Sequence, residues 1–595
     1  MSANPTFPKR FISLLSPTLV SLLFTVTIAA QQPAGDSTQA KPPASSAITG
    51  RVVNESGQPL PGVSVSVLGA GTSNGQRTAT DNEGNFRALG LDAGAYRIFV
   101  SSPGYVTEIP DLNNSVTYYR PGDSATLTLV KGGVIAGTVT NGAGEPLVNA
   151  TVRALRVKDS EGKPLQAGNQ SRERATDDRG YYRIYGLQPG SYIVSAGGST
   201  QFFSGAFGIN AYANEAPTYA PAATRDTAAE IVVRSGQEAA ADIRYRGEPG
   251  HSISGRVTGV QTPQPYGSGV RLTDIESHAM ISATSATGDD RTFQLNGVAD
   301  GDYEISALAG AGPNTDMAAS SARRVSVRGS DVTGIELNLA PLASIAGRVN
   351  IETDPKLNCG RHRDTALRET VIAVRRSRID EKPDAKNSKD KSTQTSDPLS
   401  FLLTSSDAVP NDKGEINLRN LFAGVYRFEP RLAGGGWYVK AITVGPNGPN
   451  IPRDGIGLKS GDKITGVTIT ITEGAGGLRG HISVVEGQRV PEGLRVYLVP
   501  AERDNAENVL RFFEGATETD ATFAINNIAP GRYWIIVRAA DDGDPTKVKP
   551  IRQESALRAR VLREAEALQK EVSFKPCERL ADYELSYSSP ATRAP

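Results

Sequence analysis

The sequence predicts an all-β fold: a tandem array of about five small β-sandwich modules, with one amphipathic helix near the C-terminus. The main observation is a pattern that recurs five times along the 595 residues, as in repeat proteins. Apolar and polar residues alternate around each copy, as in strands that bury one face. The 62 glycines and 37 prolines supply the turns that many short strands need, so the composition favours the same fold class.

The recurring pattern has four fixed positions. A turn glycine is found at Gly94, Gly190, Gly301, Gly424 and Gly531. A tyrosine follows two residues later, as Tyr96, Tyr192, Tyr303, Tyr426 and Tyr533. An aliphatic residue precedes the glycine by three positions (Leu91, Leu187, Val298, Leu421, Ile528), and a larger apolar residue precedes it by eight (Phe86, Tyr182, Phe293, Ile416, Phe523). One tyrosine per module at a fixed place indicates a packing residue whose hydroxyl is satisfied at a turn, so we do not predict these tyrosines as ligands.

The clearest copy of the pattern runs from Asp81 to Val100. Asp81-Asn82-Glu83-Gly84 has the signature of a type I turn. Alternating apolar residues lie on both sides of a second turn at Ala93-Gly94, which predicts a β-hairpin. The residues expected in the core are Phe86, Leu91, Tyr96 and Ile98.

Glycines mark two further positions of the repeat. The glycine of the first turn recurs as Gly84, Gly180 and Gly414, but Arg291 and Ala521 replace it in the third and fifth copies. Another glycine lies inside the strand that opens each module, at Gly50, Gly137, Gly255, Gly347 and Gly480. A glycine inside a strand marks close approach of another backbone or a bend, so we expect one of these at each opening strand.

These patterns divide the chain into modules of about seven short strands, the signature of a small sandwich. The predicted modules are 48–132, 133–248, 249–342, 343–474 and 475–595. The second carries an insertion at 197–226, and the fourth contains a charged, solvated loop at 380–398. In the fifth, residues 552–570 predict a helix followed by a last strand near 572–574. The apolar face expected on this helix consists of Leu557, Val561, Ala565 and Leu568.

The N-terminal residues indicate export. Lys9 and Arg10 precede an apolar run from Phe11 to Ala30, which is typical of a secretory signal peptide over residues 1–30. An uncleaved membrane anchor is the alternative, because the run approaches the ~20 residues that span a bilayer. Residues 31–47 have the composition of a disordered linker. We therefore expect an extracytoplasmic protein, whether secreted, periplasmic or on the outer surface, with no membrane span after signal cleavage.

Three motifs carry a resemblance to a known family. They are the opening I-x-G-x-V strand, the P-x-x-G-V-x-V second strand of the first module, and D-x-x-G-x-F followed by L-x-x-G-x-Y. On these residues the chain resembles the carboxypeptidase regulatory-like domain family of bacterial extracytoplasmic proteins. The resemblance implies a seven-stranded, Greek-key, transthyretin-like sandwich, related to starch-binding-like domains. It implies a structural, adhesive or accessory role without peptidase activity, since in metallocarboxypeptidases this domain is appended to the catalytic one.

Catalytic chemistry is not predicted. The four histidines, His251, His278, His362 and His481, lie in separate stretches and none has the paired spacing of a zinc peptidase. Residues 71–75 fit G-x-S-x-G but join two predicted strands, whereas the nucleophile motif needs a helix after it. Asp81 to Gly84 and Asp177 to Gly180 lack the ligand spacing of calcium loops and are predicted turns. No catalytic residue, metal ligand or cofactor is therefore expected.

A binding surface is predicted from aromatic residues, because sugars stack on aromatic faces. The candidates are Phe202, Phe203, Phe207, Tyr212 and Tyr219 of the insertion, together with Trp437, Tyr438 and Trp534. The alternative is that the insertion folds back and buries its rings as a satellite cluster. Nucleic acid is not expected as a partner, since 64 basic residues balance 64 acidic ones and no basic patch carries interleaved aromatics.

The sequence does not decide whether its two cysteines pair. Cys359 and Cys577 fall in adjacent modules and are able to pair in an oxidising compartment, which would lock the fourth module to the fifth, but sequence does not show their spacing.

The predicted function is a non-catalytic binding or structural protein of the cell envelope, with carbohydrate or an envelope protein as partner. The alternative is an accessory or regulatory part of a carboxypeptidase or of an outer-membrane transporter system.

Overall fold

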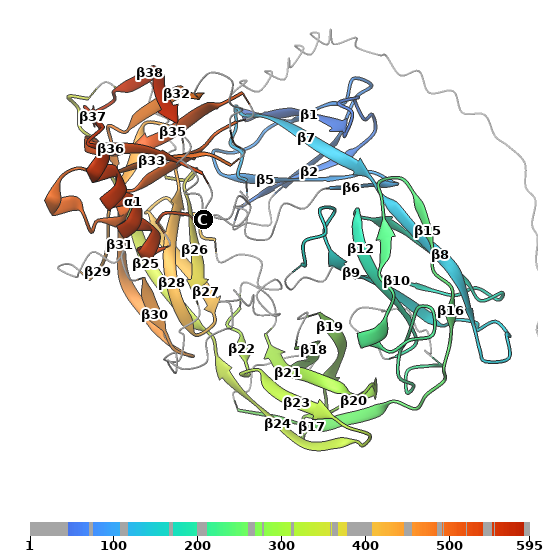
Figure 1. The fold of residues 1–595 in the computed structure, drawn as a ribbon. Coiled ribbons are helices and arrows are strands. Elements are labelled where there is room, and N and C mark those ends of the chain that lie inside the picture. The colour runs from blue at the N-terminus through green and yellow to red at the C-terminus, as the bar shows by residue number, and fades with distance from the viewer. Residues whose placement is uncertain are drawn as a thin grey trace, which may run out of the picture. The chain divides into compact units, whose positions relative to one another are not determined.

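The fold comes from a computed structural model, drawn as a ribbon in Figure 1. The described residues are 46–70, 75–107, 117–165, 171–198, 211–259, 268–275, 279–310, 315–357, 359, 367–377, 407–432, 434–445, 455–484, 491, 493–518, 520–539, 550–552 and 554–587. The predicted signal peptide (1–30), nearly all of the linker and the charged loop (380–398) lie outside them. Within them the chain consists of β-strands, three-residue 3₁₀ turns and one α-helix, so the all-β prediction is confirmed.

The strands group into the five predicted modules. Module 1 contains β1 (Ile48–Asn54), β2 (Ser64–Gly69), β3 (Gly75–Ala79), β4 (Asn85–Ala88), β5 (Tyr96–Ser101), β6 (Tyr105–Thr107) and β7 (Ser124–Lys131). Module 2 contains β8 (Gly133–Thr140), β9 (Thr151–Lys158), β10 (Ser171–Ala175), β11 (Tyr181–Leu187), β12 (Gly190–Ala196), β13 (Thr218–Tyr219), β14 (Ile231–Val233), β15 (Glu238–Ala240) and β16 (Ile243–Arg244).

Modules 3 to 5 follow the same order. Module 3 contains β17 (His251–Gly259), β18 (Ser268–Asp274), β19 (Met280–Ala286), β20 (Thr292–Val298), β21 (Gly301–Ala309), β22 (Ala318–Ala319), β23 (Arg323–Val327) and β24 (Val332–Pro341). Module 4 contains β25 (Ala343–Glu352), β26 (Val371–Ser377), β27 (Glu415–Leu421), β28 (Gly424–Arg431), β29 (Trp437–Val444), β30 (Ile456–Leu458) and β31 (Lys463–Glu473). Module 5 contains β32 (Gly476–Val484), β33 (Arg495–Pro500), β34 (Phe513–Ala516), β35 (Thr522–Ile528), β36 (Gly531–Arg538), α1 (Ser555–Leu568), β37 (Glu571–Phe574) and β38 (Arg579–Tyr587).

Each module packs two layers of strands around its own apolar core. In module 1 the layer β4-β1-β7-β6 faces the layer β3-β2-β5, and Val52 from one layer packs with Val65 from the other. Modules 2, 4 and 5 repeat this arrangement. Module 3 differs because the short β22 pairs with both β21 and β24, which joins its two layers into one continuous sheet.

The two strands of the repeated motif do not pair with each other, so the predicted hairpin is wrong. The two strands of the repeated motif form, but β4 lies antiparallel to β1, whereas β5 lies antiparallel to β2 in the other layer. The same crossing between layers occurs in the four other modules. Alternation of apolar residues shows only which face of a strand is buried. Both strands bury a face in the same core from opposite layers, so the local pattern looks like that of a hairpin.

The repeated tyrosines hold the segment that crosses between the layers. All five are buried, and each donates its hydroxyl to the backbone carbonyl four residues earlier. The acceptors are Asp92 for Tyr96 (2.8 Å), Gln188 for Tyr192 (2.7 Å), Ala299 for Tyr303 (2.9 Å), Phe422 for Tyr426 (3.0 Å) and Ala529 for Tyr533 (2.7 Å). Burial raises the pKa of Tyr192 to about 12, so this hydroxyl keeps its proton near neutral pH. The predicted packing role of the tyrosines is confirmed.

The opening glycines admit a neighbouring backbone, as expected. In every module the first strand runs parallel to a strand from the end of the module: β1 with β7, β8 with β15 and β16, β17 with β24, β25 with β31, and β32 with β38. A Cβ on Gly50 would lie 2.3 Å from the Ala125 oxygen, and one on Gly255 would lie 1.9 Å from the Ile335 oxygen. Nonbonded atoms do not approach so closely, so these positions require glycine.

The C-terminal helix and the strands after it depart from the prediction in two details. Val561 and Ala565 are buried on α1 as expected, but Leu568 is 63% exposed and Arg558 is buried instead. The Arg558 guanidinium donates to the Arg552 carbonyl at 2.7 Å, which gives the buried charge a partner. The strand near 572–574 forms as β37, but it is not the last strand, because β38 follows it beside β32. None of the helices in the described part is long and apolar enough to span a bilayer.

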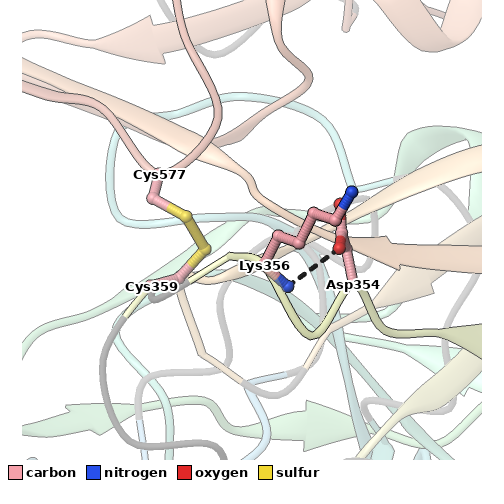
Figure 2. The surroundings of a disulfide bond; sticks show 4 residues. All are labelled: Asp354, Lys356, Cys359 and Cys577. Atoms are coloured by element: carbon pink, nitrogen blue, oxygen red, sulfur yellow. Dashed lines mark hydrogen bonds between the residues drawn. A yellow bond between two sulfur atoms is a disulfide. The ribbon is translucent and has the colours of Figure 1, made fainter.

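Cys359 and Cys577 form a disulfide, which answers the question that the sequence left open. Their Cα atoms lie 5.0 Å apart across a sequence separation of 218 residues. Cys359 follows β25, close to the turn in which Asp354 accepts from the backbone N–H of Lys356, and Cys577 precedes β38 (Figure 2). The disulfide therefore crosslinks module 4 to module 5.

Candidate binding surface

The aromatic residues predicted in the insertion divide into two groups. Phe202, Phe203 and Phe207 lie outside the described residues. Tyr212 is partly buried against the core of module 2, with its ring edge-on to that of Tyr245 at a centroid distance of 5.6 Å. Tyr219 is buried in a small cluster whose other members include Leu155, Ile193 and Ala279. The described rings of the insertion are therefore packed and not presented to solvent, as in the alternative interpretation, but the cluster around Tyr219 also includes Ala279 of module 3.

The three aromatic residues predicted elsewhere occupy three different clusters. Trp437 is 7% exposed within the core of module 4. Tyr438, the next residue, is partly buried against the core of module 5. Trp534 is partly buried against the cluster that includes Val561 of α1. The structure does not bring these rings together, so they form no common surface.

A different aromatic row lies on the outer face of module 2. Strand β11 alternates strictly, with Tyr182 and Ile184 in the core. Tyr181, Arg183 and Tyr185 point away from the core on the opposite face. Tyr181 is 39% exposed and Tyr185 is 49% exposed, which places both among the large apolar side chains that the module leaves open to solvent. At a strand rise of about 3.3 Å per residue, the two tyrosines are separated by roughly 13 Å along the strand.

An ion pair and a cation–π contact position side chains on this outer face. Arg183 lies between the two tyrosines and contacts the carboxylate of Glu238 on β15 through Nη2 at 2.9 Å and Nε at 3.1 Å. The guanidinium of Arg174 on β10 lies 4.9 Å from the centroid of the Tyr185 ring. The row is therefore a pair of aromatic rings flanked by hydrogen-bonding groups that are already positioned.

The fold does not require aromatic residues in this row. The three equivalent outward positions hold Asn85, Arg87 and Leu89 in module 1, Thr292, Gln294 and Asn296 in module 3, Glu415, Asn417 and Arg419 in module 4, and Thr522, Ala524 and Asn526 in module 5. These side chains are largely polar, and their strands pair in the same way as β11. Since four modules form without tyrosines there, Tyr181 and Tyr185 are available for a role other than folding.

The corresponding face of module 1 is hollowed and polar. A hollow of about 610 Å³ is lined by residues of β1, β4 and β7, together with the end of β3. Hydrogen-bonding side chains, among them Arg51, Asn85, Arg87 and Thr126, line it. Arg51 Nε donates to the Glu83 carbonyl at 3.0 Å, which holds one wall in place. The first two modules therefore present different chemistry on the same sheet face.

The described residues show no grouping suited to metal chemistry. No set of three or more His, Cys, Asp and Glu side chains in the described ranges is arranged to hold a metal ion. His251 has Asp300 at 3.4 Å, and His481 has Glu584 at 3.9 Å, while His278 and His362 lie outside the described residues. The Asp81 and Asp177 carboxylates accept backbone N–H groups within their own turns, as predicted for turn residues.

The sequence carries a signal for the aromatic row. Tyr182 occupies a core position of the repeat, and Tyr181 and Tyr185 occupy the polar side of the same alternation. An aromatic residue on the solvent side of a half-buried strand is the feature to search for.

Comparison with known families identifies the first two modules. A model of the carboxypeptidase regulatory-like domain matches residues 47–128 and 134–245. Modules 1 and 2 are similar to carboxypeptidase regulatory-like domains. The resemblance stated on the sequence motifs is thereby confirmed for these two modules, and modules 3 to 5 are related to them by the internal repeat. Among curated proteins, none matches the chain.

Solved structures show distant likenesses. One is the Bacillus anthracis TIE protein, with 15% identity over 49% of this chain and 51% of that chain and a TM-score of 0.13. Another is GBS52, the minor pilin of Streptococcus agalactiae, with 14% identity over 37% of this chain and 98% of that chain and a TM-score of 0.18. A third is BcpA, the major pilin subunit of Bacillus cereus, with 11% identity over 49% and 99% and a TM-score of 0.13. This chain spans about half the length of the first of these.

Proposed function

We propose that the protein is a secreted, non-catalytic, multi-module protein of the cell envelope that binds carbohydrate through the outer face of module 2. The observation that carries the proposal is the row of Tyr181, Arg183 and Tyr185 on β11. The apolar C–H face of a sugar ring packs on the electron-rich face of a tyrosine. Two such rings roughly 13 Å apart on one rigid strand allow a short oligosaccharide to contact both.

The charged groups between the rings supply hydrogen bonds for hydroxyl groups. Arg183 offers guanidinium donors, and Glu238 offers carboxylate acceptors, on neighbouring parts of the same face. Sugar hydroxyls donate and accept at once, so a fixed donor–acceptor pair suits them. Because the ion pair already holds both side chains, little conformational entropy is lost on binding.

The test is binding of residues 31–595 to a glycan array and to envelope polysaccharides. We expect the double variant Tyr181→Ala, Tyr185→Ala to lose binding, and Tyr181→Phe, Tyr185→Phe to keep most of it, since phenylalanine retains the ring face. The matched control is Phe99→Ala in module 1, which removes a similarly exposed ring from another sheet and should leave binding unchanged.

Three other outcomes would each favour a different binding site, partner or role. Loss of binding on deletion of residues 197–226, with binding kept in the double alanine variant, would place the site in the insertion. Capture of an envelope protein without any glycan would favour the protein-binding alternative. Capture of a carboxypeptidase or a transporter component would favour the accessory role.

A further inference from the structure

The strand order of each module determines how it responds to tension on the chain. In module 1, β1 and β7 pair in parallel from Thr49 opposite Ser124 to Asn54 opposite Leu129. In module 3, β17 and β24 pair in parallel from Ile253 opposite Val332 to Gly259 opposite Leu339. The chain therefore enters at the start of the first strand and leaves at the end of the last one. Pulling on the two ends slides these strands along each other, so the hydrogen bonds of the ladder are loaded together and not one after another.

Two of the junctions between modules contain almost no linker. A single residue, Gly132, separates β7 from β8, and a single residue, Leu342, separates β24 from β25. Tension therefore passes directly from the last strand of one module into the first strand of the next. No loop between these strands is long enough to absorb it.

The disulfide changes this path in modules 4 and 5. Cys359 lies just after β25, and Cys577 lies just before β38 (Figure 2). The covalent route runs from β25 through the two sulfurs to β38. The segment between the cysteines, which are 218 positions apart, carries β26 to β37 and α1, and it lies outside that route. Since β25 and β38 are already extended strands, pulling on them adds almost no length.

We propose that the chain is a load-bearing link in which modules 1 to 3 resist tension by shear of their parallel end strands, while the Cys359–Cys577 disulfide takes modules 4 and 5 out of the load path. This mechanical role goes beyond carbohydrate binding and does not depend on it. It follows from strand order, linker length and the crosslink.

Reduction of the disulfide returns modules 4 and 5 to the route along which tension is carried. A dithiol reductant such as dithiothreitol gives two electrons and two protons to the disulfide, which becomes two cysteine thiols, and the reductant closes into its own cyclic disulfide. The reduced chain then gains the segment between the cysteines. Fully extended, this separation of 218 positions corresponds to about 760 Å of released chain.

The first test is single-molecule pulling of residues 31–595 held by tags at its two ends. The oxidised chain should lengthen in three large steps, one for each of modules 1 to 3, of roughly 300–400 Å each. Reductant, or the variant Cys359→Ala, Cys577→Ala, should add steps that together release about 760 Å. Identical extension before and after reduction would overturn the bypass.

The second test addresses shear in module 3. Gly255→Ala places a methyl group against the Ile335 oxygen and should lower the unfolding force of one of the three steps, because forced unfolding depends on the unfolding barrier. The matched control is Gly142→Ala in a turn of module 2, where a Cβ meets no atom within 4 Å. If Gly255→Ala prevents folding of the module, Asp331→Ala is the milder variant, since this carboxylate accepts the Ser252 N–H of β17 at 2.7 Å beside the same strand pair. Unfolding forces unchanged in a folded variant would rule out shear between β17 and β24.

Discussion

The inward and outward faces of the same strands differ in how far their side chains are repeated from one module to the next. On β11, Tyr182 points into the core, and a large apolar residue stands at the same place in every module. Tyr181 and Tyr185 point outward, and no other module has an aromatic residue at either position. The inward face repeats because close packing tolerates few side chains. The outward face varies because solvent tolerates most of them, which leaves it free to carry binding.

The largest expected effect is the loss of an inward tyrosine. Tyr303→Ala should destabilise module 3 by ~3 kcal/mol or more, because it opens a cavity in the core and removes the hydroxyl bond to Ala299. Tyr303→Phe should cost only about 1 kcal/mol, since it removes the hydroxyl and keeps the ring. Hydrogen exchange of β17 to β24 in the full chain measures both. Equal protection in the wild type and the alanine variant would contradict the core assignment.

A smaller effect on stability is expected at the first turn of the motif, where the modules have different residues in the same backbone conformation. Gly84, Gly180 and Gly414 have positive φ, and Arg291 has a φ of 47° at the same place. Arg291→Gly should therefore stabilise module 3 by about 0.5–1 kcal/mol, through relief of a left-handed conformation that suits glycine. Arg291→Ala serves as the control, because it removes the guanidinium and keeps the strained conformation. Chemical denaturation followed by hydrogen exchange in module 3 distinguishes the two, and a gain in both variants would assign the effect to the side chain.

A modest, pH-dependent effect is expected at the same turn of module 2. The backbone N–H of Tyr181, and after it that of Arg179, holds the pKa of Asp177 below its ordinary value of 3.8. A carboxylate with a lowered folded pKa contributes stability that is present above its unfolded pKa and lost as the pH falls below it. Module 2 should therefore lose stability below about pH 4. Asp177→Asn keeps the acceptor oxygen without the titration, as Asn411 does in module 4, and should weaken this dependence. Thermal melts between pH 5 and pH 2 measure it, and identical pH profiles would show that the turn does not contribute.

The smallest effect on stability is expected on the outward face. Tyr181→Ala with Tyr185→Ala should change the free energy of unfolding of module 2 by no more than about 0.5 kcal/mol per site, as for exposed residues. Tyr182→Ala on the same strand should cost several times more, because its ring is buried. Calorimetry of the three proteins measures the difference. A large loss in the outward variant would show that these rings are part of the fold, and it would weaken the carbohydrate proposal.

The amino-acid sequence by itself determined the fold class, the number of modules and the inward residues. Alternation and the spacing of Phe86, Leu91 and Tyr96 are local properties, so the sequence of each strand shows which of its faces is buried. The opening glycines were recognisable for the same reason, because a residue without a side chain in a strand indicates that another backbone lies against it.

The tertiary structure alone decided which strands pair, where the chain crosslinks and which rings reach solvent. The strands of the repeated motif separate into two layers because each finds its partner far away in sequence, and no local pattern specifies that partner. Cys359 and Cys577 meet for the same reason, across 218 residues. Trp437 and Tyr219 were attractive as ligands by residue type but are buried, whereas Tyr181 and Tyr185 are exposed. Exposure depends on all the neighbours that surround a side chain, and most of those neighbours come from elsewhere in the chain.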